Sequence, residues 1–332
     1  MPAIITLVDP FGLTAGASRV LPLLLATLMS LGVSADALAP TRPPLVTLVG
    51  PDEGDPGTSC DRFHKALGPG IAAMRVSCMA AGATDMARHD RAVADAVRSG
   101  SALIVAPGGG PASAAVHGSR GIPVVFAISV NPVPLLVPSL DRPGSHATGV
   151  SVDDTLHSKR LEFIREAFPH VRRLGVLVDR WWADGYDLEQ QMIQPARALG
   201  LTAELHIADD LPSLDALMHS PAASAVDAWY LPPTYVAYVA EDALIAHMAR
   251  LRLPAMHSTR REVERGALLA YAQDTGFTYR AMADMTQRIL AGEAPGQIPI
   301  ERPRHFMLTA RVVDDPRRQI APSLLRRAQI LP

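Results

Sequence analysis

The sequence predicts an α/β protein with two lobes, each built on a parallel sheet. The chain has 332 residues, which is more than one ordinary hydrophobic core needs. Short apolar runs alternate with amphipathic segments, as in parallel strands joined by helices. This alternation occurs on both sides of a central stretch, residues 122–182, that ends one α/β unit and begins the next.

The composition is that of a globular protein, with 48% hydrophobic and 19% charged residues. The formal net charge is only −2, so neither nucleic acid nor a membrane surface is indicated as a partner.

Residues 1–39 have the features of a leader with a cleaved signal peptide. Arg19 precedes an apolar run at 20–33, and the Ala-Leu-Ala at 37–39 has the small-x-small pattern of a cleavage site. The run is shorter than a membrane span requires, and a core helix is the alternative. We expect the mature chain to start at Pro40. No cysteine follows the site to carry a lipid anchor, so we expect the product to be free in a periplasm.

The first lobe is predicted from apolar runs bounded by Gly or Pro, the pattern of buried parallel strands. A helix ends at Arg98, with Thr84 as its cap and Met86, Val93 and Val97 on its apolar side. The expected strands are 45–49, 74–77, 102–106, 122–127 and 147–152, and the expected helices are 61–67, 84–98 and one after the glycines at 108–110.

The second lobe begins with a helix near Thr155, in which Leu156, Leu161, Ile164 and Phe168 have helical spacing. The rest follows from the same patterns. The expected strands are 174–178, 202–207, 226–231, 254–256 and 267–271, and the expected helices are 188–199, 211–219, 235–251 and 278–290.

Two cysteines, Cys60 and Cys78, leave two interpretations open. In an oxidising compartment they can form a disulfide, and otherwise they are two separate small apolar residues.

The most specific local feature is the Gly-Gly-Gly-Pro-Ala-Ser segment at 108–113, between a strand and a helix. Glycines let the backbone approach a ligand, and the helix N-terminus offers N–H groups and a positive dipole end to an anion. The alternative is a turn that only reverses the chain. The segment lacks the GxGxxG spacing and the lysine of nucleotide-binding loops.

Ligands of open parallel sheets lie beyond the carboxyl ends of the strands. Those ends are at 106–110, 129–131, 179–182, 231–235 and 271–274. Of the adjacent tryptophans at 181 and 182, we expect at most one to stack on a ligand, because neighbouring side chains point in different directions.

No catalytic or metal-binding motif is found: the eleven histidines lack HExxH or other metal spacing, and no GxSxG occurs. We expect no enzymatic activity, no cofactor and no metal.

The order of short motifs resembles the ABC-transporter substrate-binding proteins of the tryptophan/tyrosine-binding type, over most of residues 45–330. The motifs are Asn-Pro-Val at 131–133, Arg-Pro-Gly at 142–144, Ala-Thr-Gly-Val-Ser at 147–151, Lys-Arg-Leu-Glu at 159–162, Arg-Arg-Leu-Gly-Val-Leu-Val at 172–178, Gly-Ala-Leu-Leu-Ala-Tyr at 266–271 and Ile-Pro-Ile-Glu-Arg-Pro at 298–303.

The resemblance implies a type I periplasmic-binding-protein fold, with two Rossmann-like lobes joined by three crossovers and a ligand cleft between them. The lobes would comprise 40–150 with about 272–300, and 151–271 with about 301–332. The positions that match the family's ligand contacts are Gly109, Gly110, Ser113, Ser129, Asn131, Asp179, Thr234, Tyr271 and Asp274, to which we add Trp181 as an aromatic lining residue.

The resemblance also implies a function: a monomeric solute-binding protein that captures an amino acid, often an aromatic one, by hinge closure and delivers it to an ABC permease with its ATPase. Asn131 stands where the family usually has Asp, and Thr234-Tyr235 stands where it often has Asp-Asn. A related organic acid without an amine is therefore an alternative ligand. A ligand-sensing module that signals to a receptor or kinase is an alternative function, and a nucleotide-using Rossmann enzyme is a weaker one.

Overall fold

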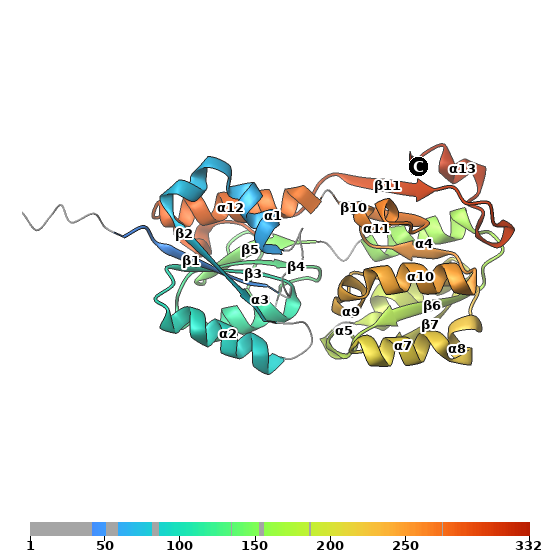
Figure 1. The fold of residues 1–332 in the computed structure, drawn as a ribbon, viewed down its shortest axis with the longest axis horizontal. Helices are drawn as coiled ribbons and strands as arrows, with labels where there is room; N and C mark the ends of the chain where they lie inside the picture. The colour runs from blue at the N-terminus through green and yellow to red at the C-terminus, as the bar shows by residue number, and fades with distance from the viewer. Residues whose placement is uncertain are drawn as a thin grey trace, which may run out of the picture. The chain divides into compact units, whose positions relative to one another are not determined.

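The computed structural model describes residues 42–50, 59–81, 86–133, 135–152, 156–185, 187–273 and 275–332. The strands of this part form one sheet of five and one of seven, and helices flank both sheets (Figure 1). The predicted α/β class with parallel sheets is confirmed. The predicted leader, residues 1–39, lies outside the described residues.

The first sheet has the order β2-β1-β3-β4-β5, and all its neighbouring strands are parallel. Its strands are β1 (Leu45–Gly50), β2 (Arg75–Ala80), β3 (Leu103–Pro107), β4 (Val124–Ile128) and β5 (Ala147–Ser151).

Helices cover both faces of the first sheet. Alternate side chains of a strand point to opposite faces, so the apolar residues of each strand form a core on either side. On one face Ile104 packs with α2 (Met86–Arg98) and α3 (Gly109–Gly118). On the other, Leu103 packs with α1 (Ser59–Leu67) and α12 (Thr275–Leu290), a helix from the last fifth of the chain.

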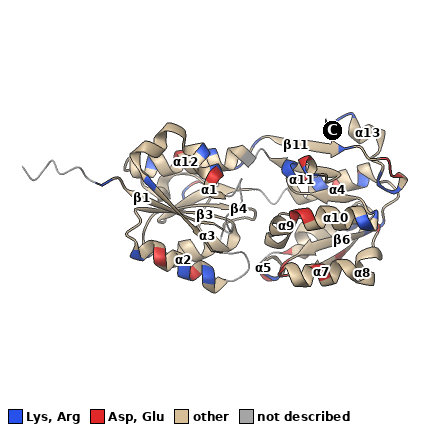
Figure 2. Ribbon diagram, viewed as in Figure 1, with Lys and Arg blue, Asp and Glu red and all other residues tan. Residues whose placement is uncertain are grey.

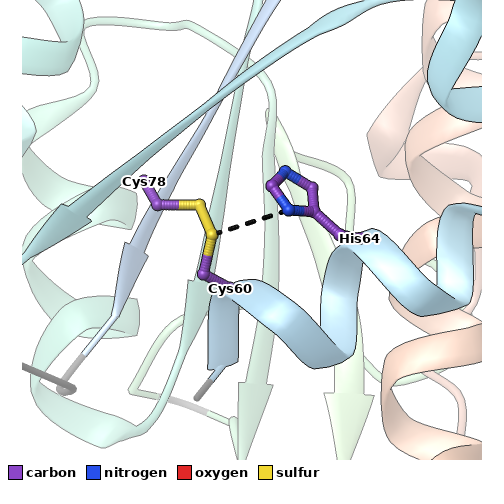
Figure 3. The surroundings of a disulfide bond; sticks show 3 residues. All are labelled: Cys60, His64 and Cys78. Atoms are coloured by element: carbon purple, nitrogen blue, oxygen red, sulfur yellow. Dashed lines mark hydrogen bonds between the residues drawn. A yellow bond between two sulfur atoms is a disulfide. The ribbon is translucent and has the colours of Figure 1, made fainter. Parts of the chain in front are cut away.

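A disulfide joins Cys60 of α1 to Cys78 of β2, with the Cα atoms 6.1 Å apart (Figure 3). Of the two interpretations that the sequence left open, the structure therefore shows the paired one. His64, one turn along α1, places its Nδ1 3.9 Å from the Cys60 Sγ. The bridge ties the start of α1 to the edge of the first sheet.

The second sheet has the order β12-β11-β10-β9-β8-β6-β7. Its strands are β6 (Arg173–Val178), β7 (Thr202–Ile207), β8 (Ala228–Tyr230), β9 (Ala255–His257), β10 (Leu269–Gln273), β11 (Phe306–Arg311) and β12 (Gln329–Leu331). Val176 faces a core shared with α4 (Leu156–Ala167) and α6 (Gln194–Ala198), and Leu177 faces one shared with α7 (Leu211–His219) and α10 (Glu241–Leu251).

Two strands, β11 and β12, depart from the parallel arrangement predicted throughout: they are parallel to each other and run opposite to the rest of the second sheet. β11 runs antiparallel to β10, with Phe306 opposite Gln273. The chain reaches β11 from α12, which packs on the first sheet, and therefore enters the second sheet at the end where its neighbours finish.

Two predicted helices have different forms. The single helix expected over 235–251 is two, α9 (Tyr235–Val239) and α10, with a break at Ala240 where the backbone leaves helical geometry (φ −101°, ψ 18°). The helix expected over 188–199 opens with a π-helical turn (Glu189–Ile193) ahead of α6, at the point where Pro195 supplies no N–H. Thr84 and Thr155, the predicted helix starts, lie outside the described residues.

Several short elements were not predicted. They are α5 (Arg180–Gly185), α8 (Pro221–Ser224), α11 (Arg260–Glu264), α13 (Pro322–Leu325), the strands β11 and β12, and 3-10 turns at Gly68–Ala73, Pro295–Gln297 and Pro316–Arg318.

Charged residues of both signs lie on the helices around the sheets (Figure 2). Basic and acidic residues share α2 beside the first sheet and α11 beside the second. This mixing agrees with the small net charge of the sequence.

The chain passes between the two sheets after β5, after β10 and after α12. Two of these crossings run together, because Val150 and Glu301 form a parallel bridge and the Ser151 N–H donates to the Glu301 carbonyl. The lobe boundaries predicted from the sequence stay a proposal.

None of the helices in the described residues has the length and apolar character of a membrane span.

Candidate functional site

A pocket of about 640 Å³ lies at the carboxyl ends of strands from both sheets. Its lining is mostly apolar and includes residues 107–111 at the end of β3, 127–129 at the end of β4, 179–182 after β6, 233–235 after β8, and Gln273 at the end of β10. These are the strand ends at which parallel α/β sheets bind ligands.

The first sheet contributes the glycine turn between β3 and α3. Gly108 has φ 104°, a conformation that side chains disfavour, and α3 starts immediately after it. A Cβ on Gly109 would lie 2.7 Å from the Trp181 ring, and one on Gly110 would lie 2.5 Å from the His89 ring. The turn therefore brings the backbone, with the N-terminal end of α3, to the pocket where no side chain would fit.

The second sheet contributes Asp179, which is buried at 5% exposure. Its carboxylate accepts hydrogen bonds from the N–H groups of Trp182 (2.9 Å) and Tyr235 (3.0 Å), at the starts of α5 and α9. Burial raises the pKa of Asp179, and these two hydrogen bonds oppose the rise. Asp179 thus holds two lining helices in place.

Thr234 has a similar role. It is 1% exposed, and its hydroxyl oxygen accepts a hydrogen bond from the Ala237 N–H (3.3 Å), capping α9. Asp179 and Thr234 are therefore both engaged with backbone donors.

Aromatic side chains form much of the second wall. Trp181 is half-buried and lines the pocket, and Trp182 lines it while 2% exposed, with its ring 5.3 Å from that of His157 in an edge-on arrangement. The expectation that at most one of the two tryptophans stacks on a ligand stays a prediction. Tyr235 and Tyr238 of α9 complete this wall.

Two further carboxylates in the lining have partners within the protein. Asp209 accepts a hydrogen bond from the Arg180 N–H (2.7 Å) and lies 3.4 Å from the Arg180 guanidinium. Glu262 accepts hydrogen bonds from the N–H groups of Ser258 (3.1 Å) and Thr259 (2.6 Å).

Glu262 also pairs with His257, whose Nδ1 lies 3.1 Å from the carboxylate. Burial raises the pKa of Glu262, but the charge of His257 and the hydrogen bonds outweigh it and hold that pKa below its ordinary value. This carboxylate is therefore ionised and internally satisfied.

Gln273 is different, because it offers an unused acceptor. Its Nε2 donates to the Thr278 hydroxyl (3.1 Å), while its buried Oε1 has no hydrogen-bond partner among the described residues. Gln273 lines the pocket and therefore can accept a hydrogen bond from a ligand.

The structure brings six of the predicted site residues to the pocket: Gly109, Gly110, Ser129, Asp179, Trp181 and Thr234. The Ser129 hydroxyl donates to the Pro233 carbonyl (3.3 Å) and so links the two walls.

Three of the other four predicted residues are not part of the lining, and the fourth, Asp274, cannot be placed. Asn131 is exposed, and its Oδ1 accepts from the Val133 N–H (3.0 Å). Tyr271 packs against Phe163, with ring centroids 4.9 Å apart. Ser113 lies further along α3, and Asp274 lies outside the described residues.

Sequence reasoning missed Trp182, Tyr235, Tyr238, Glu262 and Gln273. Tyr235 and Gln273 fall within the strand ends named from the sequence, but that rule does not say which residues of a loop face inward. Glu262 follows Thr259 at the spacing of a capping box, which the structure contains, and this signal marks a helix start rather than a site.

Two groups of metal-ligating residue types lie close together among the described residues: Cys60, His64 and Cys78, whose cysteines form the disulfide, and Asp215, His219 and His247. Neither group belongs to the pocket lining.

Two α/β units with a pocket at the carboxyl ends of both sheets define a type I periplasmic-binding-protein fold. The chain belongs to the ABC transporter substrate binding protein family, whose model matches residues 82–312. None of the curated proteins matches the chain.

Solved structures support this fold assignment. A conserved domain protein from Vibrio cholerae has a TM-score of 0.78 at 22% identity, covering 87% of this chain and 99% of its own. The ABC domain in complex with L-Trp from Streptococcus pneumonia has a TM-score of 0.75 at 20% identity, covering 86% and 100%. The ligand-free, open substrate-binding protein CD0873 from Clostridium difficile has a TM-score of 0.58 at 17% identity, covering 87% and 99%.

Proposed function

We propose that this protein is exported to the periplasm, where it captures a small carboxylate-bearing solute and delivers it to an ABC permease with its ATPase. The observation that carries the proposal is the pocket of about 640 Å³, lined from both sheets, in a member of the substrate-binding family. That volume suits a drug-sized or smaller molecule.

An aromatic amino acid, or a related aromatic acid, fits the chemistry of the lining. Trp181 and its aromatic neighbours offer faces on which a ring can stack. The N-terminal end of α3 attracts a carboxylate, and the Gln273 Oε1 accepts a hydrogen bond from an ammonium group or a neutral donor. Asp179, Asp209 and Glu262 already have partners within the protein, which leaves room for an acid without an amine.

Capture by hinge closure follows from the two-sided lining. A solute that contacts both walls binds the closed form more tightly than an open one, and so shifts the population toward closure. The paired crossings at Val150 and Glu301 are the expected hinge.

A thermal-shift screen of the purified protein, refolded to remove bound solute, tests this proposal. The panel contains aromatic and aliphatic amino acids, aromatic carboxylates without an amine, other organic acids and nucleotides. A ligand at one hundred times its Kd adds about 2.7 kcal/mol, which corresponds to a rise in Tm of about 4 °C for a chain of this length.

Two variants make the screen specific. We expect Trp181→Ala to reduce the shift and Asn131→Ala to retain it. A shift with nucleotides alone would contradict the proposal, and so would the absence of any shift across the panel.

A further inference from the structure

Asp215, His219 and His247 form a cluster on two helices away from the pocket lining. Asp215 and His219 are one turn apart on α7, and His247 comes from α10. We propose that these three side chains form a binding site for a late first-row divalent metal ion such as Zn²⁺. The proposal is independent of the solute-binding function.

The distances suit a small metal ion. The Asp215 carboxylate oxygen lies 3.3 Å from His219 Nδ1 and 3.8 Å from His247 Nε2, and one ligand atom from each residue lies within 4.8 Å of the others. Zn²⁺ binds nitrogen and oxygen ligands at about 2.0–2.2 Å in a tetrahedron, which sets adjacent ligand atoms about 3.4 Å apart. Small rotations of the exposed Asp215 and His219 side chains can bring the three ligand atoms to this spacing.

The helices that carry the three ligands are fixed by core packing. Leu214 and Met218 of α7 share a hydrophobic cluster with Leu244 and Met248 of α10. His219 directly follows Met218, and His247 directly precedes Met248. The backbone positions of the ligands are therefore set by buried neighbours, so metal binding does not have to bring the helices together.

The ligand chemistry also favours a transition metal. Two imidazoles and one carboxylate match zinc sites with three protein ligands, where water fills the fourth position. His219 is in the last turn of α7, whose negative dipole end attracts a cation. The His219 Nδ1 also lies 2.9 Å from the Asp215 carbonyl oxygen, and the exposed ring can turn away from that carbonyl so that Nδ1 faces the metal.

Arg250 is the competitor for this site. One guanidinium nitrogen donates to the Met218 carbonyl (2.7 Å) and lies 3.2 Å from His247 Nδ1. When Nε2 of a neutral imidazole binds a metal, Nδ1 carries the proton and cannot accept from Arg250. Metal binding therefore requires Arg250 to release His247, while the bond to the Met218 carbonyl can remain.

The second metal-capable group supplies a matched control. His64 lies beside Cys60 and Cys78, but the disulfide occupies both sulfur atoms (Figure 3). In the oxidised protein this group offers one imidazole and no thiolate. His64→Ala should therefore leave metal binding unchanged.

The test is calorimetric titration of ZnCl₂ into the full chain, purified without a histidine tag and kept oxidised. We expect one Zn²⁺ per chain, with His219→Ala and His247→Ala each weakening binding by about tenfold or more. Arg250→Met should strengthen it, and excess Mg²⁺ should not compete because the site has one carboxylate.

Three results would overturn the proposal: no saturable uptake of Zn²⁺, uptake that survives the two histidine substitutions, or uptake lost in His64→Ala. His247 is 12% exposed at its side chain, so folding of His247→Ala is checked by circular dichroism. If that variant does not fold, His219→Ala decides the result, because the His219 side chain is 55% exposed.

Discussion

The two walls of the pocket are built in different ways. The wall from the first sheet presents backbone, at glycines whose missing side chains leave room for Trp181 and His89. The wall from the second sheet presents side chains, and its buried Asp179 and Thr234 hold the helices that carry the aromatic rings. Substitutions should therefore harm the first wall by adding volume and the second by removing hydrogen bonds.

The largest effect is expected at Asp179. Asp179→Ala removes the acceptor for the Trp182 N–H in the first turn of α5 and for the Tyr235 N–H at the start of α9. Loss of two caps should lower the free energy of unfolding by about 2–4 kcal/mol, measured by urea denaturation.

Asp210→Ala is the matched control, because Asp210 caps only α7 and lies outside the pocket lining. We expect a smaller loss there and no change in solute affinity. Equal losses in the two variants would show that Asp179 does not hold two helices.

The adjacent glycines separate stability from binding. Gly110→Ala places a Cβ against His89, which is 1% exposed, and this overpacking should cost about 1–3 kcal/mol of stability. Gly109→Ala instead meets Trp181 across the pocket, so we expect little loss of stability and about tenfold weaker solute binding, equal to about 1.4 kcal/mol.

Thermal denaturation and calorimetry measure the two effects. The double variant Gly109→Ala/Trp181→Leu should restore room beside the new methyl group, so the two walls should recover part of their closure. It should not recover the aromatic surface on which a ligand ring stacks. An equal loss of stability in Gly109→Ala and Gly110→Ala would contradict this interpretation. It would show that the close approach of Gly109 to Trp181 is not a contact between the two walls of the pocket.

A pH effect should come from His157, behind the second wall. His157 is fully buried, with its Nδ1 2.5 Å from the Tyr230 hydroxyl, and burial, helped by the charge of Arg160, holds its pKa well below the ordinary value. In the unfolded chain this imidazole takes up a proton below about pH 6.5. Stability should therefore fall as the pH drops from about 6.5 toward the lowered folded value.

The slope of this loss is at most about 1.4 kcal/mol for each pH unit. His157→Gln removes the titrating group. The difference in unfolding free energy between wild type and variant therefore gives the contribution of His157 to the pH dependence, separate from that of the other histidines. A difference that does not change between about pH 7 and pH 5 would contradict the burial of a neutral His157.

The smallest effect is expected at Asn131. Its side chain is exposed and accepts from the Val133 N–H, so Asn131→Ala should change solute affinity by no more than about twofold. The family resemblance alone predicts a larger loss. Calorimetry with the solute found in the thermal-shift screen distinguishes the two expectations.

Most of the architecture could be predicted from the sequence, because buried parallel strands are continuous apolar runs that Gly and Pro interrupt. The short elements could not. α5 begins inside a segment that the sequence marks only as the end of a strand, and its start depends on Asp179 accepting from the Trp182 N–H. The antiparallel β11 depends on α12 packing against the first sheet, which local patterns do not encode.

The sequence predicted which loops surround the candidate site better than it predicted which side chains line it. The strand-end rule finds the loops around the pocket, but Asn131 turns back on its own backbone and Tyr271 packs on Phe163. Conversely, Glu262 and Gln273 reach the pocket from segments whose local sequence signals only a helix start or a strand end. Which side chain faces inward is decided by tertiary contacts.

In the proposed function, both walls close on one solute. Small-angle X-ray scattering of the refolded protein, with and without the solute found in the screen, measures this closure. We predict a smaller radius of gyration with the solute in wild type, and no such change in Gly109→Trp, whose side chain would occupy the space between the walls. A radius that stays constant in wild type while calorimetry shows saturable binding would contradict closure.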